Sequence, residues 1–309
     1  MVRRSTRRDA LVPLPSRVAL LACSAVNSTR YQLVRLANGV HSVRSIEHRE
    51  TFHPVVGPVA EAEALYVNQL RLPERLRRHR GEFVIWDVGL GAAANVLTVL
   101  RATRGIRCAL RIVSFDLTLD PLKFGMEQAD ALGYFDGFEE SLHQLLEQQR
   151  VMFCDAEQSV SWEVRLGDFP DWIAQPTADS VPAPHAILFD AFSPATNPSM
   201  WTLPLFANLF RKLNLKSPCA MPTYSRSTML RVTLLLAGFF VGAGHATGEK
   251  EETTIAANIL ELIDDPLGQT WLQRARRSTS AEPLHGPVYR QSRLAPETWE
   301  RLQRHPQFQ

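Results

Sequence analysis

Residues 83–97 read FVIWDVGLGAAANVL, and this stretch decides the fold class. An apolar run ends at Asp87, Gly89 and Gly91 follow, and a helical pattern of apolar residues then begins. This order predicts a buried strand, a tight loop and a helix. Glycines let the loop backbone approach a ligand closely, and the helix N-terminus behind them offers free N–H groups.

The acidic residue ahead of the glycines bears on which ligand the loop would take. A carboxylate at Asp87 suits a cationic or hydroxyl-bearing ligand such as S-adenosylmethionine better than the two phosphates of NAD. The spacing Gly89-x-Gly91-x-x-Ala94 also satisfies the loose dinucleotide fingerprint. The loop alone therefore leaves both ligands open, together with a plain turn that binds nothing.

Composition restricts the class of protein. The chain has 309 residues, is 45% hydrophobic, and contains no apolar run long enough to predict a transmembrane helix. Its four cysteines lack CxxC or CxxH spacing, which argues against a zinc site or a disulfide framework and favours a reducing, cytoplasmic location. We therefore expect no bound metal and no membrane partner.

Positive charge is concentrated at the two ends of the chain. Residues 1–17 carry five arginines against one aspartate, and residues 273–309 carry seven arginines against three glutamates. The formal net charge of the whole chain is only +2, so the body between these ends is acidic. Basic ends are typical of phosphate contacts with RNA, although solvated tails without a partner look the same.

Strand patterns alternate with helix patterns through the middle of the chain, which predicts an α/β fold with a doubly wound, mostly parallel sheet. The expected strands are residues 83–88, 111–116, 161–166, 186–190, 218–224 and 253–259, and the expected helices are 93–103, 201–213 and 226–237. Ahead of them, alternating residues around Asn38-Gly39 predict a small β-hairpin, and residues 59–71 predict a helix.

Four aspartates stand where predicted strands end: Asp87, Asp116, Asp168 and Asp190. Any one of them could be a helix cap or a turn residue. In an open α/β sheet, however, the carboxyl ends of the strands line the ligand crevice. We expect Asp116 near the ribose hydroxyls, Asp168 near the adenine amino group, Asp87 near the methionine ammonium through water, and Asp190 facing the methyl acceptor.

The segment 190–201, DAFSPATNPSMW, is the second informative feature. Two prolines and an asparagine predict a stiff, non-helical loop. Phe192 beside the acidic Asp190 suits the stacking of a base that has been splayed out of an RNA strand. Trp201 is expected in the core.

The pattern Asp-x-Phe-x-Pro-x-x-Asn-Pro-x-Met-Trp at 190–201 resembles the methyltransferase half of the MnmC family. The likeness runs over about residues 30–262, and includes the glycine loop with Asn95, Thr223-Tyr224-Ser225, and residues 63–67 beginning at Glu63. This resemblance implies a class I S-adenosylmethionine-dependent methyltransferase with a Rossmann-like fold. The implied reaction is methylation of the exocyclic amine of 5-aminomethyl-2-thiouridine at the tRNA wobble position.

Position and resemblance together select the candidate site residues. We expect Asp190, Phe192 and Tyr224 to serve catalysis, and the cofactor to be held by Asp87, Gly89, Gly91, Asn95, Asp116, Asp168 and Glu63. No oxidase half follows, so a separate enzyme is expected to supply the aminomethyl substrate.

The sequence patterns and the charge distribution also predict the domain boundaries. We expect a disordered basic leader at 1–25, a hairpin-plus-helix appendage at 26–75, a methyltransferase domain at 76–264 with a helical insert at about 120–155, and a loosely held basic tail at 265–309.

Four departures from the family pattern keep other functions open. Ala191 and Ala93 replace glycines, Thr196 replaces a frequent lysine, and residues 249–252 are mostly acidic where the family is basic. A polyamine-synthase-like aminopropyltransferase would also read Asp-Ala-aromatic at 190–192. A non-catalytic module that binds a nucleotide or RNA is the other alternative. A NAD-linked dehydrogenase is less favoured, because no catalytic His/Lys pair is evident.

Overall fold

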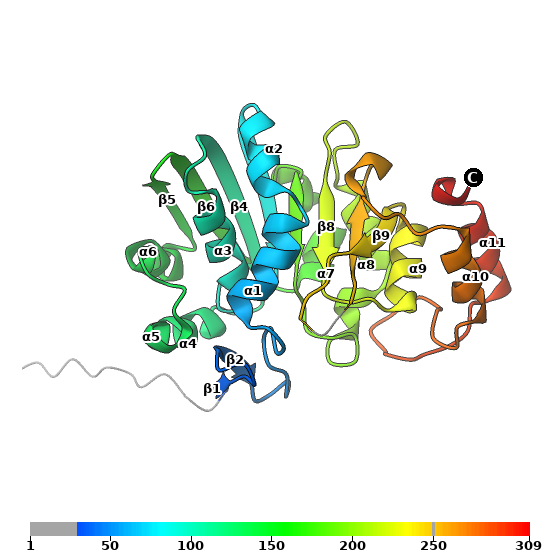
Figure 1. Cartoon of the computed structure of the whole chain (residues 1–309), viewed down its shortest axis with the longest axis horizontal. Coiled ribbons are helices and arrows are strands. Elements are labelled where there is room, and N and C mark those ends of the chain that lie inside the picture. Colours follow the sequence, from blue (N-terminus) through cyan, green and yellow to red (C-terminus); the bar gives the residue numbers. More distant parts are fainter. Residues whose placement is uncertain (1–29, 249–250) are drawn as a thin grey trace, which may run out of the picture.

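The computed structural model describes residues 30–248 and 251–309 (Figure 1). The predicted leader at 1–25 lies outside these described residues. Among the described residues, no helix combines the length and the apolar character needed to cross a membrane.

The centre of the molecule is an eight-stranded sheet in the order β5-β6-β4-β3-β7-β8-β10-β9. Strands β6, β4, β3, β7 and β8 run parallel to one another, whereas β5 and β10 run antiparallel to the strands beside them, and β9 pairs antiparallel with β10. The bounds are β3 Glu82–Val88, β4 Cys108–Asp116, β5 Arg150–Asp155, β6 Gln158–Leu166, β7 Ala186–Phe189, β8 Ala220–Thr223, β9 Phe240–Gly244 and β10 Thr253–Ala257. This topology confirms the predicted doubly wound, mostly parallel fold.

Helices cover both faces of the sheet because alternate residues of each buried strand point to opposite sides. Phe83 and Ile85 of β3 join one apolar core, and Val84 and Trp86 join the other. The first core is covered by α1 Pro58–Ala62, the π-helical turn Glu63–Asn68, α2 Leu72–Arg78 and α3 Ala94–Thr103. The second is covered by α7 Phe169–Ala174, α8 Leu203–Arg211 and α9 Thr228–Ala237. The predicted insert contains α4 Asp120–Glu127, α5 Ala129–Leu132 and α6 Glu139–Gln148.

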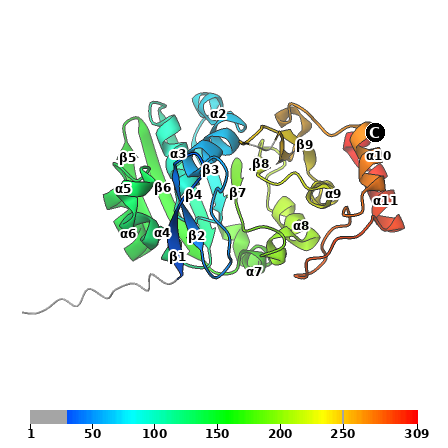
Figure 2. The same cartoon turned by 60° about the horizontal axis from the view of Figure 1, so that its bottom comes forward.

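The predicted hairpin is present as β1 Tyr31–Arg35 and β2 His41–Ser45, with Leu33 paired to Val43. It lies outside the main sheet, near the N-terminal end of α1 (Figures 1 and 2). The helix after it does not stand apart with the hairpin, because Ala62 and Leu65 are buried in the first core.

Two strands were absent from the sequence prediction. Strand β5 is an edge strand whose Met152 is 80% exposed, so it lacks the apolar signal of an inner strand. Strand β9 reads FVGAG, and its two glycines weaken the strand pattern.

The segment after residue 264 is packed onto the domain, in contrast to the loosely held tail that its composition predicted. It contains α10 Gln269–Arg277 and α11 Pro296–Gln303, with Trp271 and Leu302 buried in the second core. The Gln307 side chain bonds both the N–H and the C=O of Val241 at 2.7 Å. The sequence prediction missed helix α10 because the segment is rich in arginine. The apolar face of this amphipathic helix consists of only three residues, Trp271, Leu272 and Ala275.

The connection between α10 and α11 is a loop closed at its neck. The carbonyl of Ser292 accepts hydrogen bonds from the N–H groups of Ala281 and Glu282, and the carbonyl of Leu284 accepts one from Leu203. Beyond this neck Val288 is 70% exposed, and Arg290 and Arg293 are exposed as well. Figure 1 shows this loop along the same lower edge of the molecule as the hairpin.

Candidate active site

A cavity of about 510 Å³ lies at the carboxyl ends of β3, β4 and β7. The segments that line it include the glycine loop after β3, the segment 48–54 that follows the hairpin, and the loop 190–201 after β7. The crevice is therefore at the edge of the sheet where parallel α/β folds bind their ligands.

The glycine loop forms the floor of the cavity. Gly89 has φ 96°, and a Cβ placed there would lie 2.6 Å from the carbonyl oxygen of Asp190. Gly91, with φ 52°, donates its N–H to Asp116 Oδ2 at 2.9 Å. Ala93, which replaces a family glycine, also has a left-handed φ of 62°, so this departure retains the loop shape at a cost of about 1 kcal/mol.

Asp116 and Asp168 both line the cavity, as predicted, but both also hold backbone in place. Asp116 accepts N–H bonds from Gly91 and Leu117, and burial raises the pKa of its carboxyl. Asp168 is exposed and accepts the N–H of Asp171 at 3.0 Å as the N-cap of α7. Each aspartate can therefore hold backbone in place and still offer a carboxylate oxygen to a ligand.

Asp87 and Glu63 are not among the residues that line the cavity. Asp87 is 1% exposed and accepts a hydrogen bond from Ser114 Oγ at 2.7 Å. Burial raises its pKa to about 7. Glu63 is exposed on the π-helical turn, and the carboxylate of this region that does reach the cavity is Glu61.

The floor fits S-adenosylmethionine on its polar atoms. Asn95 lines the cavity, and its Oδ1 atom is buried with no hydrogen-bond partner among the described residues. A buried carbonyl oxygen in this position calls for a donor from a ligand. Together with the close backbone approach at Gly89 and Gly91 and the carboxylate of Asp116, this matches a ligand that has an ammonium and ribose hydroxyls.

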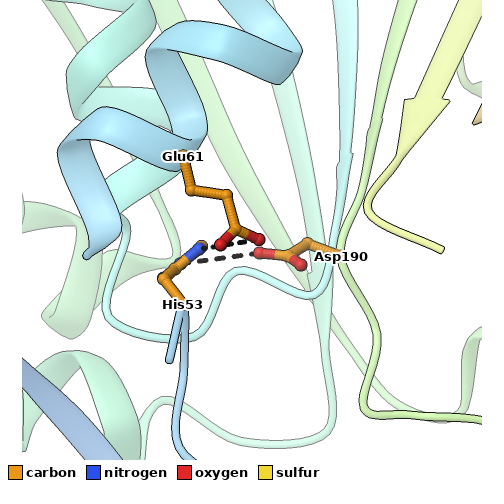
Figure 3. Close-up of side chains that lie close together, drawn as sticks. All are labelled: His53, Glu61 and Asp190. Carbon is orange, nitrogen blue, oxygen red and sulfur yellow. Dashed lines mark ion pairs between the residues drawn. The ribbon is translucent and has the colours of Figure 1, made fainter. Parts of the chain in front are cut away.

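Asp190 lies where the cofactor floor meets the rest of the cavity. Its Oδ2 atom accepts a hydrogen bond from Asn95 Nδ2 at 2.8 Å and lies 3.5 Å from His53 Nε2. The other ring nitrogen, His53 Nδ1, lies 3.9 Å from Glu61 Oε1, and the two carboxylates lie close to each other (Figure 3). The sequence analysis selected Asp190 and missed His53 and Glu61.

Aromatic rings surround the acceptor side of Asp190. The ring of Phe192 lies 4.4 Å from that of His48 and 5.6 Å from that of Phe52, measured between centroids. Tyr224 donates its hydroxyl to the carbonyl of Ala191 at 3.0 Å, and burial holds its pKa well above the ordinary value. Trp201 is fully buried, as expected, and donates Nε1–H to the Phe192 carbonyl at 2.7 Å.

Glu50 ties the hairpin segment to loop 190–201. Its carboxylate accepts the Ser193 N–H at 3.0 Å, the Ser193 hydroxyl, and the Thr196 hydroxyl at 2.5 Å. Thr196, which replaces the frequent family lysine, thus has a partner in the same carboxylate. Ala191, the other departure in this loop, adopts no left-handed backbone and carries no strain from its Cβ.

Comparison with known proteins gives the class. A family model described as S-adenosyl-L-methionine-dependent methyltransferase matches residues 136–259, a range that includes loop 190–201. The structure of MnmC2 from Aquifex aeolicus superposes with a TM-score of 0.65 at 23% identity, covering 88% of this chain and 82% of that one. The fold, the cavity and these matches define the chain as an S-adenosylmethionine-dependent methyltransferase of the class I fold.

Curated relatives narrow the class further. The chain is 25% identical over 236 residues to the tRNA 5-methylaminomethyl-2-thiouridine biosynthesis bifunctional protein MnmC of Aliivibrio fischeri, over 70% of this chain and 33% of that protein. It is 28% identical over 246 residues to MnmC of Methylibium petroleiphilum, over 77% of this chain and 36% of that protein. The chain is thus a relative of the MnmC proteins that spans about one third of their length.

Proposed function

We propose that this methyltransferase acts on the exocyclic amine of 5-aminomethyl-2-thiouridine at the wobble position of tRNA. The observation that carries the proposal is the position of Asp190, which joins the glycine floor to the aromatic wall made by His48, Phe52 and Phe192. An amine attached to a flat base needs a carboxylate beside a stacking surface, and this end of the cavity offers both.

The residues of the chain supply position and proton transfer. S-adenosylmethionine, when bound, supplies the electrophilic methyl group. Asp190 orients the amine and accepts its hydrogen bond, and Asn95 fixes the carboxylate at 2.8 Å. Phe192 stacks on the base. Because the reaction is an in-line displacement, most of the rate enhancement comes from holding the two reactants in this geometry.

The substrate of this reaction is tRNA that already carries the aminomethyl group. A reaction that removes a substituent and exposes the primary amine must therefore come first. Because tRNA maturation takes place in the cytoplasm, we place the protein there.

The test is transfer of labelled methyl from S-adenosylmethionine to tRNA bearing 5-aminomethyl-2-thiouridine, with unmodified tRNA as the control. We expect label on the modified tRNA alone. Asp190→Asn should lower kcat by about 100-fold or more, while the Kd for S-adenosylmethionine changes little. Transfer of an aminopropyl group from decarboxylated S-adenosylmethionine to a polyamine, assayed separately, would favour the aminopropyltransferase-like alternative, which the MnmC relatives do not support. Cofactor binding without turnover on either acceptor would favour a binding module.

A further inference from the structure

One buried histidine stands between two carboxylates behind the acceptor side of the cavity. His53 comes from the loop after the hairpin, Glu61 from α1 and Asp190 from the end of β7 (Figure 3). The His53 side chain is 8% exposed, and Glu61 and Asp190 are 5% and 16% exposed. His53 also has a left-handed φ of 48°, a backbone conformation that costs a non-glycine residue about 1 kcal/mol or more. The fold therefore holds His53 in a backbone conformation that the residue by itself disfavours.

The two ring nitrogens of His53 face different carboxylates. Nε2 lies 3.5 Å from Asp190 and Nδ1 lies 3.9 Å from Glu61. Only the protonated imidazole carries an N–H on both nitrogens and can satisfy both carboxylates at once. Burial alone would lower the pKa of His53, but Asp190 and then Glu61 outweigh burial and raise it. The phenols of Tyr66 and Tyr224 and the carboxyl of Asp87 also interact with Asp190. Burial raises the pKa values of all three groups and keeps both phenols neutral.

We propose that His53 receives, through Asp190, the proton that the substrate amine loses, and that Glu61 positions His53 for this transfer. This inference rests on the proposed function. The amine nitrogen uses its lone pair to bond the methyl carbon, and the carbon–sulfur bond breaks with its electron pair left on sulfur. The N–H proton moves to the Asp190 carboxylate and from there to Nε2 of neutral His53, which becomes the imidazolium that Glu61 stabilises. Asp190 touches the amine, so it is the catalytic residue, and His53 and Glu61 are positioning residues behind it.

The same three side chains have ligand atoms within 4.8 Å of one another, which raises the possibility of a metal ion. A single cation bound by all three would take one imidazole nitrogen. The nearest contacts of Asp190 and Glu61 are with different ring nitrogens, so we favour a shared proton over a shared cation at this cluster.

The first test is the pH profile of kcat for wild type, His53→Asn and His53→Gln on the modified tRNA. The wild-type kcat should fall at low pH as His53 becomes protonated. Both variants should lose about 10-fold to 100-fold in kcat at alkaline pH and lose that acid limb, with the KM for tRNA and the Kd for S-adenosylmethionine within about 3-fold. His143→Asn, at an exposed position on α6, is the matched control and should keep the wild-type profile.

The second test needs no turnover. NMR titration of the free protein labelled at histidine should give His53 a pKa above 6.5, and Glu61→Gln should lower that pKa. A His53 pKa at or below 6.5, or His53 variants with unchanged kcat and pH profile, would overturn the inference alone. Loss of activity with a chelator and recovery with added Zn²⁺ or Mn²⁺ would replace it with a metal site. Absence of transfer by the wild type would overturn the proposed function as well.

Discussion

The two ends of the cavity are built in different ways. The cofactor end comes mainly from one stretch, residues 87–118, in which Gly91 bonds Asp116 across only 25 residues. The acceptor end is assembled from distant segments, because Glu50 bonds Ser193 across 143 residues and His53 faces Asp190 across a similar separation. The cofactor end is therefore a local property of the sequence, whereas the acceptor end exists only in the completed fold.

The largest effect we expect concerns the buried floor of the cofactor end. Burial raises the pKa of Asp87 to about 7, so the folded protein retains a proton that the unfolded chain releases near pH 4. This contribution to stability is full below about pH 4 and is lost as pH rises through 7. From pH 5 to pH 8 the free energy of unfolding of the wild type should fall by about 3 kcal/mol more than that of Asp87→Asn.

Urea titrations at several pH values measure this difference. Asp264→Asn, at a side chain that is 61% exposed, is the control and should follow the wild-type pH dependence. Parallel curves for wild type and Asp87→Asn would show that the carboxyl of Asp87 is ionised in the folded protein.

The second prediction targets the contact between the two ends. A Cβ at Gly89 would meet the Asp190 carbonyl at 2.6 Å, so Gly89→Ala must displace both the floor and the start of loop 190–201. We expect S-adenosylmethionine to bind about 10-fold to 100-fold more weakly by calorimetry, as 1–3 kcal/mol of strain implies. Gly81→Ala is a matched control, because Gly81 also has a positive φ, of 84°, but open space around its Cβ position. Equal affinities in the two variants would mean that the contact between Gly89 and the Asp190 carbonyl does not affect cofactor binding.

The third prediction separates the acceptor end from the cofactor end. Glu50→Gln removes the charge that holds Ser193 and Thr196, and should lower kcat/KM for the modified tRNA by about 10-fold. The Kd for S-adenosylmethionine should stay within about 2-fold, since Glu50 does not bond the glycine loop. Glu47→Gln, at an exposed glutamate of the same segment, serves as control. A matching loss in cofactor affinity would show that the two ends are not independent.

The smallest effect we expect extends the acceptor end to the loop between α10 and α11. Arg290→Ala together with Arg293→Ala should raise the KM for tRNA several-fold and reduce its salt dependence, because each arginine would neutralise a phosphate. The pair Arg80→Ala and Arg107→Ala, ahead of β3 and β4 at the opposite edge of the sheet, should leave KM unchanged. If both pairs behave alike, RNA does not contact the loop.

The same contrast explains what the sequence could predict. The glycine loop, Asp116, Asp168 and Asp190 follow strands with clear apolar runs, so their position at one edge of the sheet could be derived. His53 sits in a short loop with no periodic pattern, and nothing local connects it to Asp190. Glu61 and Glu63 are two residues apart near the start of a helical segment, so sequence alone did not decide which of them faces the cavity. The C-terminal helices were missed because so few of their residues are apolar.

The bond between Glu50 and Ser193 also has a consequence for synthesis on the ribosome. The carboxylate of Glu50 emerges 143 residues before the serine that it holds. At a typical elongation rate this wait lasts on the order of 10 s. During it the hairpin can contact earlier partners such as Phe124, but loop 190–201 is not yet present. Strands β3 and β4 pair with each other within residues 82–116, so these two strands and α3 can come together before the outer partners β6 and β7 emerge. The acceptor end must therefore be among the last parts of the molecule to form. A nascent chain can form the glycine loop of the cofactor end well before it has an acceptor site.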